Sequence, residues 1–348
     1  MRFLTLYMGI YKKVIPLTKI KFGLMSEYAF PAIIQEDIKK LNEMFGAQLF
    51  SKTAVLNAIT AYVFGHKGKQ LRPALVFLSA RIFGEVTETT YSAAYMVELL
   101  HNATLIHDDV VDDAEKRRNL LSVKSVWKNK VAVLAGDYYL AKGLLFAMEH
   151  NEIKMLEIMS NAVREMSEGE LKQIENAKTL ENTEESYFDI IKNKTAALFR
   201  SSMIMGAYSS HAASDDDIAK ISKIAEYLGI AFQIRDDALD YSKTNILGKA
   251  PLNDLQENKM TLPLIYALQQ VSLAERTKIK WQMKTKHSDK AAMQAVADFV
   301  IAHGGITYVQ EKSKSFCEQA KELCLTFPES ESRKALIDLI DYVRISEV

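Results

Sequence analysis

The sequence predicts an all-α protein, and three observations support this fold class. Only six prolines and fourteen glycines interrupt 348 residues, and apolar residues recur with helical spacing in the long segments between them. No run alternates apolar and polar residues between hairpin signals, as a half-buried strand does. The breaks between helical segments are short, which makes consecutive helices antiparallel. We therefore expect a single-domain antiparallel helical bundle over residues 25–348.

Proline and glycine mark where several helices begin and end. Pro31 and Pro73 fit helix first turns, because the N–H that proline lacks has no helical partner there. Gly84 ends one helix, and the polar stretch 242–258 is expected to be a loop. The predicted helical segments are 55–64, 71–83, 87 to about 114, 130–149, 152 to about 177, 187–212 with a break near Asn193, 215–241, and 261 to the C-terminus with breaks at Gly304-Gly305 and Pro328.

Residues 1–24 are expected to form a peripheral or disordered extension. Their short apolar run breaks at Lys12 and Lys13, and no small-residue cleavage site follows, which argues against a signal peptide. No run in the chain approaches the ~20 apolar residues of a transmembrane helix. Cys317 and Cys324 lie two helical turns apart and are expected to be buried thiols of a reducing compartment. These features predict a cytoplasmic protein.

The overall charge is balanced, with 44 basic and 44 acidic residues and a formal net charge of +0. Nothing in this balance attracts the whole protein to nucleic acid or to an anionic membrane. Charge chemistry must therefore be local, and the sequence concentrates it in two acidic clusters.

The first acidic cluster follows an apolar helical segment. In HNATLIHDDVVDDAEKRRN, Asp108 and Asp109 precede Asp112 and Asp113. Residues four apart share a helix face, so Asp108 is expected over Asp112 and Asp109 over Asp113. Like charges at ~4 Å repel by ~1 kcal/mol in water and by several times more in a low-dielectric cleft. Such a cluster on a mostly buried helix indicates a cation site, and hard oxygen ligands suit Mg²⁺.

The same pattern recurs behind a second apolar run. FQIRDDALDY places Asp236, Asp237 and Asp240 after IAEYLGIA. A single DDxxD is most often a solvated surface cluster, whereas two copies in one chain are far rarer by composition. Bundles hold metals on the inward faces of facing helices. The two clusters therefore predict a magnesium site between two helices.

Basic residues stand near both clusters. Lys69 and Arg72 lie at a helix N-terminus, which favours anions through its free N–H groups and dipole, and they fit a diphosphate clamp. The alternative is a solvated capping loop. His101 lies two turns before Asp108 on the same helix face. The other candidates are Arg117 and Arg118 after the first cluster, Lys194 and Thr195 at a helix start, and Lys249 and Lys259 after the second cluster.

This set of residues suits a reaction between two diphosphate esters. Mg²⁺ bound to one ester would withdraw charge from a leaving diphosphate, and Lys, Arg and His would hold the other ester directly. The sequence contains no Ser–His–Asp, Cys–His or HExxH arrangement. It also lacks a GxxxxGK[ST] phosphate loop and a dinucleotide fingerprint.

The sequence resembles the polyprenyl synthetases, which are trans-isoprenyl diphosphate synthases. GKQLRP, HDDVVDDAEKRRN, GDYYLAKG, KTAALF, FQIRDDALDY and LGKAPLNDLQENKMTLPLIYAL each match a family motif, in the family order. The resemblance covers roughly residue 27 to the C-terminus. It implies an all-α bundle around a central cavity, the isoprenoid synthase fold, usually as a homodimer. One departure is Asn119, where the family commonly has glycine. Asn tolerates the left-handed conformation, so we expect no loss of activity.

The resemblance also implies roles for individual residues. Mg²⁺ would be bound by Asp108, Asp109 and Asp112 on one wall and by Asp236, Asp237 and Asp240 on the other. The allylic diphosphate would be contacted by Arg117, Lys194 and Lys259, with Lys249 as a weaker candidate. Isopentenyl diphosphate would be held by Lys69, Arg72, His101 and Arg118. Thr195 and Gln233 would lie beside the reacting carbons. The implied reaction is head-to-tail condensation, in which the allylic diphosphate ionises, the alkene attacks and a proton leaves.

The helix before Asp108 is expected to wall the cavity in which the product grows. Family members that stop early place aromatic rings four and five residues before the first aspartate, where this chain has Thr104 and Ala103. From Asp108 back to Val97 the helix rises ~16 Å, with no aromatic side chain on that face. This predicts a long-chain product, heptaprenyl to decaprenyl, of the kind used for quinone side chains.

Several alternatives stay open. A shorter farnesyl or geranylgeranyl product would follow if Phe146 or Met148 blocked the cavity. A terpene cyclase also uses an aspartate-rich helix, but its second metal motif is usually of the Asn/Ser/Glu type. A metal phosphohydrolase would use the pair His107-Asp108 but needs further histidines. A regulatory subunit of a heteromeric synthase should lack one acidic cluster, and this chain has both.

Overall fold

The computed structural model describes residues 31–66, 68–117, 120–241 and 252–344, and these residues are almost entirely helical. The elements in chain order are α2 (Ala32–Gln48), α3 (Ala54–Gly65), α4 (Leu71–Phe83), α5 (Glu88–Val111), β1 (Lys116–Arg117), β2 (Leu120–Leu121), α6 (Val123–Trp127), α7 (Asn129–Glu149), α8 (Ile153–Thr179), α9 (Glu184–Ile191), the π-helix η1 (Lys192–Ala196), α10 (Ala197–Ser209), α11 (Asp215–Leu239), α12 (Asn253–Gln256), α13 (Leu262–Gln269), α14 (Leu273–Lys286), α15 (Lys290–Ala302), α16 (Gly305–Cys324) and α17 (Glu331–Val343).

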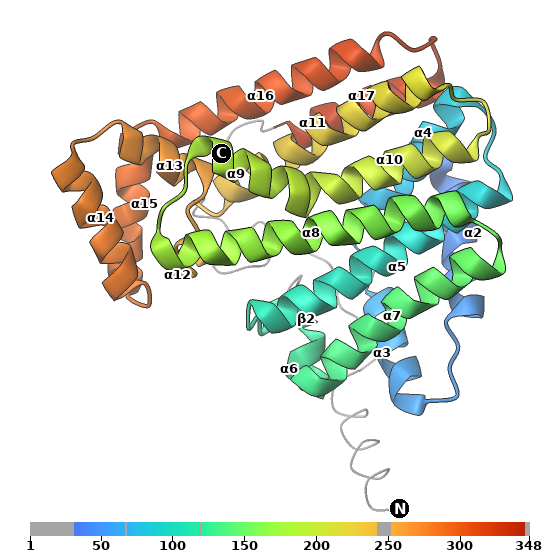
Figure 1. Ribbon diagram of the computed structural model, residues 1–348, viewed down its shortest axis with the longest axis horizontal. Coiled ribbons are helices and arrows are strands. Elements are labelled where there is room, and N and C mark those ends of the chain that lie inside the picture. The colour runs from blue at the N-terminus through green and yellow to red at the C-terminus, as the bar shows by residue number, and fades with distance from the viewer. Residues whose placement is uncertain (1–30, 67, 118–119, 242–251, 345–348) are drawn as a thin grey trace, which may run out of the picture.

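The long helices lie side by side in a bundle, which confirms the predicted all-α class. α5, α7, α8, α10, α11 and α16 run along the longest dimension of the molecule (Figure 1). α5 packs on α4, α7 and α10, while α11 packs on α10 and α16. α4, α5 and α10 are buried on nearly every side. Helices that are apolar all round need neighbours all round, so these three form the centre of the core.

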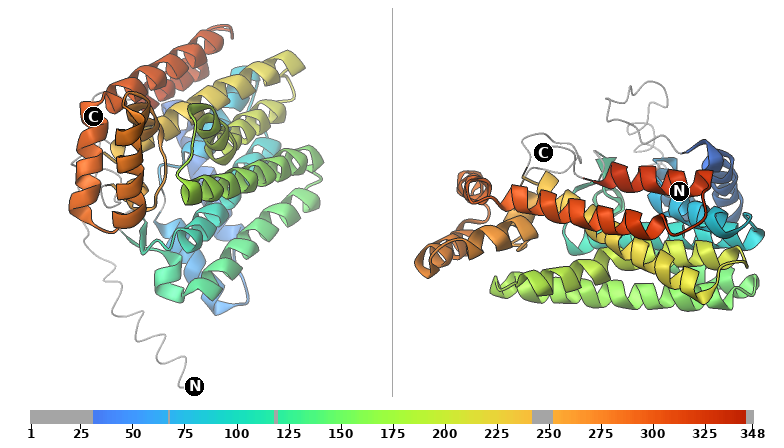
Figure 2. Two further views of the ribbon diagram at one scale, coloured as in Figure 1. Left: turned by 60° about the vertical axis from the view of Figure 1, so that its left-hand side comes forward. Right: turned by 90° about the horizontal axis from the view of Figure 1, so that it is seen from above.

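The C-terminal helices form a smaller apolar cluster. It joins the last turns of α11 to α9, α13, α15 and α16. The α14–α15 hairpin stands out from the bundle, as Figures 1 and 2 show from three directions. The acidic ends of α5 and α11 point toward this same side of the bundle (Figure 1). The chain therefore gathers both predicted acidic clusters at one end of the fold.

Two glycines allow close helix contacts around η1. A Cβ atom at Gly169 of α8 would lie 2.8 Å from the backbone nitrogen of Lys194, and one at Gly229 of α11 would lie 2.6 Å from the Cα atom of Ala196. Both distances are shorter than ordinary van der Waals contact. Glycine at these positions lets α8 and α11 enclose the π-helix, which replaces the helix break predicted near Asn193.

The structure corrects three sequence predictions about the elements. α5 ends at Val111 rather than near residue 114, and an antiparallel β1–β2 hairpin follows, with Arg117 paired with Leu120. Two strands of two residues are too short to show alternation in the sequence. The C-terminal region also breaks before α14 and before α15, where the side chains of Ser272 and Asp289 cap the next helix. The predicted loop 242–258 contains the short helix α12.

Other predictions concern single residues or the termini. Cys317 and Cys324 are buried free thiols, as predicted, and burial raises the pKa of each to about 11. The extension 1–24 and the first part of the loop, residues 242–251, lie outside the described residues. Among the described helices, α7 alone is long and apolar enough to cross a membrane, and it packs on α5, as a helix of a soluble core also can.

Candidate functional site

The first acidic cluster divides at the end of α5. Asp108 lies in the last turn and Asp112 is the first residue beyond the helix, and its backbone N–H donates to the Asp108 carbonyl at 2.8 Å. Asp113 then adopts a left-handed backbone conformation, with φ of 51°. Its side chain is exposed and pairs with Lys124 of α6. The prediction that Asp109 lies over Asp113 is therefore wrong, because the helix ends before the second pair can form.

Asp108 is half-buried among charged side chains. Burial raises the pKa of Asp108 to about 6. Lys194 and Arg117 oppose this rise in pKa, while Glu170 and Asp112 add to it. Charges from α8, from η1 and from the hairpin after α5 therefore converge on this carboxylate. Because a buried carboxylate is stabilised by a neighbouring cation, the position suits a bound positive charge.

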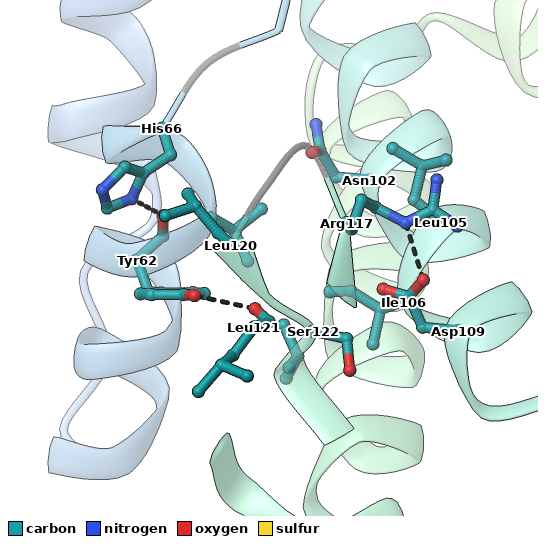
Figure 3. Close-up of a pocket in the computed structure, with 12 residues that line it drawn as sticks. Tyr62, His66, Asn102, Leu105, Ile106, Asp109, Arg117, Leu120, Leu121 and Ser122 are labelled. Carbon is teal, nitrogen blue, oxygen red and sulfur yellow. Dashed lines mark hydrogen bonds and ion pairs between the residues drawn. The ribbon is translucent and has the colours of Figure 1, made fainter. Parts of the chain in front are cut away.

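Asp109, the next residue, faces the β1–β2 hairpin. Its carboxylate is buried and accepts a hydrogen bond from Nε of Arg117 at 2.7 Å. Figure 3 shows this pair at the edge of a small pocket between α3, α5 and the β1–β2 hairpin. Tyr62 of α3 closes the far side by donating a hydrogen bond to the carbonyl of Leu121 at 2.7 Å. Asp109 thus holds the hairpin arginine in place, whereas Asp108 and Asp112 face the interior charges.

The second acidic cluster is held by neutral hydrogen-bond donors. Asp237 is buried and accepts from the Tyr187 hydroxyl at 2.6 Å and from Nε2 of Gln233 at 2.8 Å. Burial and the nearby Asp254 and Asp236 together raise the pKa of Asp237 to about 8, against the lowering effect of the two hydrogen bonds. The Thr195 hydroxyl in turn donates to Oε1 of Gln233 at 2.7 Å. A cation near these acids would relieve the repulsion between them.

Asp240 follows the last residue of α11 and organises the next segment. Its two carboxylate oxygens accept from the backbone N–H groups of Asn253 and Asp254, each at 3.1 Å. These N–H groups belong to the first turn of α12, whose free donors favour an anion. These two hydrogen bonds hold Asp254 near Asp237, where its charge raises the pKa of Asp237. Sequence reasoning did not single out Asp254, although it lies within one of the motifs that resemble the family.

Two neighbouring residues of η1 reach the two clusters separately. Lys194 acts on the carboxylate of Asp108 and forms an ion pair with Glu170 of α8. Thr195, the next residue, binds Gln233 one turn before Asp237. One dipeptide therefore lies between the acidic end of α5 and the acidic end of α11. π-Helical turns are frequent at functional sites because they turn side chains out of the regular helical register.

Lys259 makes a second connection between the clusters. Its Nζ atom lies 3.6 Å from Oδ1 of Asp112, and it also pairs with Glu257. Burial alone would lower the pKa of Lys259, but Asp254, Asp112 and Glu257 outweigh burial and raise it. Arg117, Lys194 and Lys259 each pair with a carboxylate of the chain, so acids and bases neutralise one another at this end of the bundle.

The predicted diphosphate clamp divides into two contacts. Nη1 of Arg72 lies 3.1 Å from Nε2 of His101, and the guanidinium lies over the Phe199 ring at 5.2 Å. Lys69 is exposed and contacts the hydroxyl and the ring of Tyr342 on α17. The structure therefore brings Arg72 and His101 together and places Lys69 against the C-terminal helix. Arg118 and Lys249 lie outside the described residues.

Arg235 is a further basic residue near this clamp that sequence reasoning missed. It directly precedes the second acidic pair, donates to the Tyr342 carbonyl at 2.8 Å and lies 5.1 Å from the Tyr342 ring. Lys69 and Arg235 thus flank the same tyrosine. The position of Arg235 next to Asp236 was a signal in the sequence. Tyr342, which connects Arg235 to Lys69, lies more than a hundred residues after Arg235 in the chain.

The donor set fits a hard divalent cation that also binds a ligand. The candidate ligands are carboxylate oxygens, and among the described residues no three His, Cys, Asp or Glu side chains converge closely enough to hold a metal alone. Mg²⁺ is usually bound through one or two carboxylates, waters and substrate phosphates. Asp108 and Asp112 on one wall and Asp236 on the other can each provide this partial coordination.

Comparison with known proteins gives consistent matches. Residues 53–300 match the family model described as Polyprenyl synthetase. Octaprenyl diphosphate synthase of Haemophilus influenzae is 31% identical over 322 residues, which are 92% of this chain and 97% of that protein. The structure of a polyprenyl synthase from Caulobacter crescentus, complexed with calcium and isoprenyl diphosphate, superposes with a TM-score of 0.85 at 29% identity and covers 92% of this chain and 98% of that one.

A shorter-chain synthase matches as well. Geranylgeranyl pyrophosphate synthase of Bacteroides thetaiotaomicron is 34% identical, with a TM-score of 0.76, and the match covers 90% of this chain and 98% of that one. The bundle is therefore the fold of these synthases, as the sequence predicted. Relatives named for long and for shorter products share it, so the fold does not determine product length.

Proposed function

The chain belongs to the polyprenyl synthetase family and is a prenyltransferase, and on that premise we propose that it condenses isopentenyl diphosphate head-to-tail onto an allylic diphosphate to form a long-chain polyprenyl diphosphate. The observation that carries the proposal is the position of η1. Lys194 lies beside the first acidic cluster and Thr195 is joined to the second. Substrates bound between the two acidic clusters would have their reacting groups held in a defined geometry, which favours reaction.

The cofactor we propose is Mg²⁺, held by Asp108 and Asp112 at the end of α5 and by Asp236 on α11. Bound there, it would withdraw charge from the departing diphosphate. Lys194 and Lys259 already pair with carboxylates in this region. As divalent cations neutralise the acids, these lysines become available to hold diphosphate oxygens. Asp109 contributes by fixing Arg117 at 2.7 Å, and Asp237 and Asp240 contribute by fixing Gln233 and α12.

The second substrate, isopentenyl diphosphate, is assigned to the clamp of Arg72, His101 and Lys69. Arg72 is oriented by its contact with His101 and by the Phe199 ring. A guanidinium fixed in this way loses little freedom when it binds a diphosphate. Arg118, which lies outside the described residues, is proposed as a further contact.

Cation stabilisation is assigned to the Thr195–Gln233 pair. The hydroxyl donates to the amide oxygen at 2.7 Å, and the amide nitrogen donates to Asp237. This chain of hydrogen bonds fixes the direction of both dipoles. Preorganised dipoles stabilise a developing charge because they need not reorient during the reaction.

The predicted long-chain product rests on small residues along α5. Ala103 is buried and Thr104 is half-buried, with its hydroxyl bound to the carbonyl of His101 at 2.9 Å. Met148, one of the two alternative stoppers, is 60% exposed and does not face the interior. Phe146 is buried and lies 4.6 Å from the ring of Tyr95 on α5. These two rings lie about two turns N-terminal of Ala103, ~12 Å along the helix, and we propose that they form the floor of the product cavity. A farnesyl or geranylgeranyl product remains the alternative if this floor is too shallow.

We also propose a homodimer that meets through α7, and a cytoplasmic location. α7 presents Val133, Leu134, Leu145 and Met148 to solvent, each at least 39% exposed. Leu134, Leu145 and Met148 recur at spacings that put them on one face of the helix. An exposed apolar face of this kind is typical of a surface that a partner covers. A second copy of the chain would cover it with the same residues, as two-fold symmetry requires.

Product analysis of purified protein tests the proposed reaction. Incubation with Mg²⁺, isopentenyl diphosphate and farnesyl diphosphate should give polyprenyl diphosphates of seven to ten isoprene units by mass spectrometry. Allylic diphosphate alone should stay unchanged, whereas a terpene cyclase would consume it. Because the primer already has three units, a product that stops at four units would support the shorter-chain alternative. Turnover of the allylic substrate without isopentenyl diphosphate would contradict the condensation itself.

A further inference from the structure

α14 is a strongly basic helix in a chain without net charge. It carries five basic residues and one acidic residue, Glu275, whereas the whole chain has 44 of each sign. The helix packs on α15 and stands out from the bundle (Figures 1 and 2). No catalytic assignment uses it. The basic residues are Arg276, Lys278, Lys280, Lys284 and Lys286.

One face of α14 is buried, and the opposite face carries an exposed aromatic ring. Ile279 and Met283 are buried, and they fix the face that packs on α15. Trp281 lies between them in sequence and on the opposite face, and its residue surface is 58% exposed. Lys278 and Lys284 stand three residues before and after Trp281, so both flank the indole on the same face.

The exposed side of α14 carries apolar as well as basic side chains. Leu273, two turns before Trp281, is 76% exposed. Thr277 and Thr285 stand four residues to either side of the indole, and both direct their hydroxyl groups to carbonyls of the helix itself. Both hydroxyl groups are therefore already hydrogen-bonded within the helix, and they add little polar surface beside the indole.

From this arrangement we propose that the exposed face of α14 is a docking surface for an anionic lipid bilayer. Lysines near such a surface are attracted to anionic headgroups. Trp281, which lies between the lysines, and Leu273, at the start of the helix, would enter the boundary between headgroups and acyl chains, where indole rings concentrate in membrane proteins. A polyanion without an apolar layer, such as RNA, would satisfy the lysines but leave Trp281 and Leu273 in water.

The position of this docking surface is compatible with the proposed reaction, although the docking proposal does not depend on that reaction. α14 lies on the side of the bundle toward which the acidic ends of α5 and α11 point (Figure 1). A polyprenyl chain is insoluble in water, so an enzyme held at a bilayer could pass such a product directly into lipid. Binding to vesicles needs no turnover, and it can be measured whether or not the proposed condensation occurs.

Vesicle binding by full-length protein tests this proposal. The probes are vesicles of phosphatidylcholine alone and of phosphatidylcholine with phosphatidylglycerol, sedimented with the protein at low salt. Wild-type protein should bind the anionic vesicles preferentially. The double variant Lys278→Gln/Lys284→Gln should bind them about 30-fold more weakly, since each basic residue near the surface contributes roughly fivefold. Trp281→Ala should weaken binding by about tenfold. The matched control is Lys154→Gln/Lys314→Gln, which removes two exposed lysines elsewhere and should bind like wild type.

The two tryptophans of the chain allow a direct readout of insertion. In a Trp127→Phe background, Trp281 is the only tryptophan, and vesicles with brominated acyl chains should quench its fluorescence. Equal binding to neutral and anionic vesicles, full binding by the lysine double variant, or no quenching of Trp281 in sedimented protein would each overturn the proposal. Binding of transfer RNA without binding of vesicles would also overturn it and would assign α14 to nucleic acid. Circular dichroism establishes that each variant is folded.

Discussion

The Nζ atom of Lys259 lies 3.6 Å from Oδ1 of Asp112 and joins the end of α5 to the segment after α12. This contact connects two stretches that are far apart in the chain. Asp254, which also raises the pKa of Asp237, helps to keep the Lys259 ammonium charged. One half-buried cation therefore interacts with acids that follow α5 and acids in and after α12.

Replacement of Lys259 by Gln should weaken substrate binding more than folding. The variant should raise KM for the allylic diphosphate by roughly 30-fold, because a charge-assisted hydrogen bond to phosphate contributes ~2 kcal/mol. Steady-state kinetics measures this, and Lys314→Gln on α16, an exposed surface lysine, is the control. An unchanged KM with a lower kcat would instead assign Lys259 to the chemical step.

Removal of Asp108 or Asp236 should abolish turnover and leave the fold intact. Asp108→Ala and Asp236→Ala should each lower kcat by at least ~10³, the loss of several kcal/mol of charge stabilisation. Burial already disfavours the charge on Asp108, so its loss should not destabilise the protein. Asp113→Ala is the control, because Asp113 belongs to the same acidic run but has an exposed side chain. Wild-type rates in either of the first two variants would refute the metal assignment.

Asp237 should make the free energy of unfolding fall as pH rises. Burial and the neighbouring acids raise the pKa of its carboxyl from an ordinary value of 3.8 to about 8 in the folded protein. Between these values the folded state holds the proton and the unfolded chain has released it, so stability declines with pH until about pH 8. Asp237→Asn removes this decline. In urea unfolding with EDTA, the variant should gain at least ~1 kcal/mol on wild type between pH 5 and pH 9.

The control for the pH prediction is Asp338→Asn, which alters an exposed aspartate of α17. Its stability difference from wild type should stay constant over the same range. EDTA keeps divalent cations away from the acids, since a bound cation favours the charged carboxylate. A difference between Asp237→Asn and wild type that does not change with pH would show that Asp237 is ionised in the folded protein at neutral pH.

The sequence could predict the acidic clusters because both stand at the ends of long apolar helices. Asp108 and Asp236 are local signals, and helical spacing places them in the last turns of α5 and α11. The end of α5 at Val111 has no local signal in the sequence, because it depends on the turn into the β1–β2 hairpin and on the contact of Asp109 with Arg117. The same limit explains why Asp112 and Asp240 lie just outside their helices.

Long-range partners could not be read from the pattern. Glu170 stands in an acidic stretch of α8 that resembles an ordinary solvated face, yet it pairs with Lys194. Arg235 and Lys69 meet at Tyr342, which lies near the C-terminus. In each case the partner is chosen by how helices pack, and packing is not encoded in the spacing of nearby residues.

The apolar face of α7 should hold two copies of the chain together. Leu134→Glu combined with Leu145→Glu places two charges on this face and should convert a dimer into the 39.3 kDa monomer. Light scattering after size-exclusion chromatography measures the mass. Leu171→Glu is the control, because Leu171 is exposed on α8 and should leave the mass unchanged. A wild-type protein that is already monomeric would contradict the proposed interface.

Product length should respond to the volume at Ala103. Ala103 is 1% exposed, so a larger side chain must either fill the product cavity proposed beside α5 or strain the core. Ala103→Phe should shift the products to fewer isoprene units, and Ala103→Leu should give an intermediate shift. Overpacking costs ~1–3 kcal/mol in stability, and thermal melts report this separately. The reciprocal change, Phe146→Ala, removes a ring from the aromatic floor and should lengthen the products. If mass spectrometry finds the wild-type distribution in all three variants, growth of the chain does not pass this face of α5, and another wall sets its length.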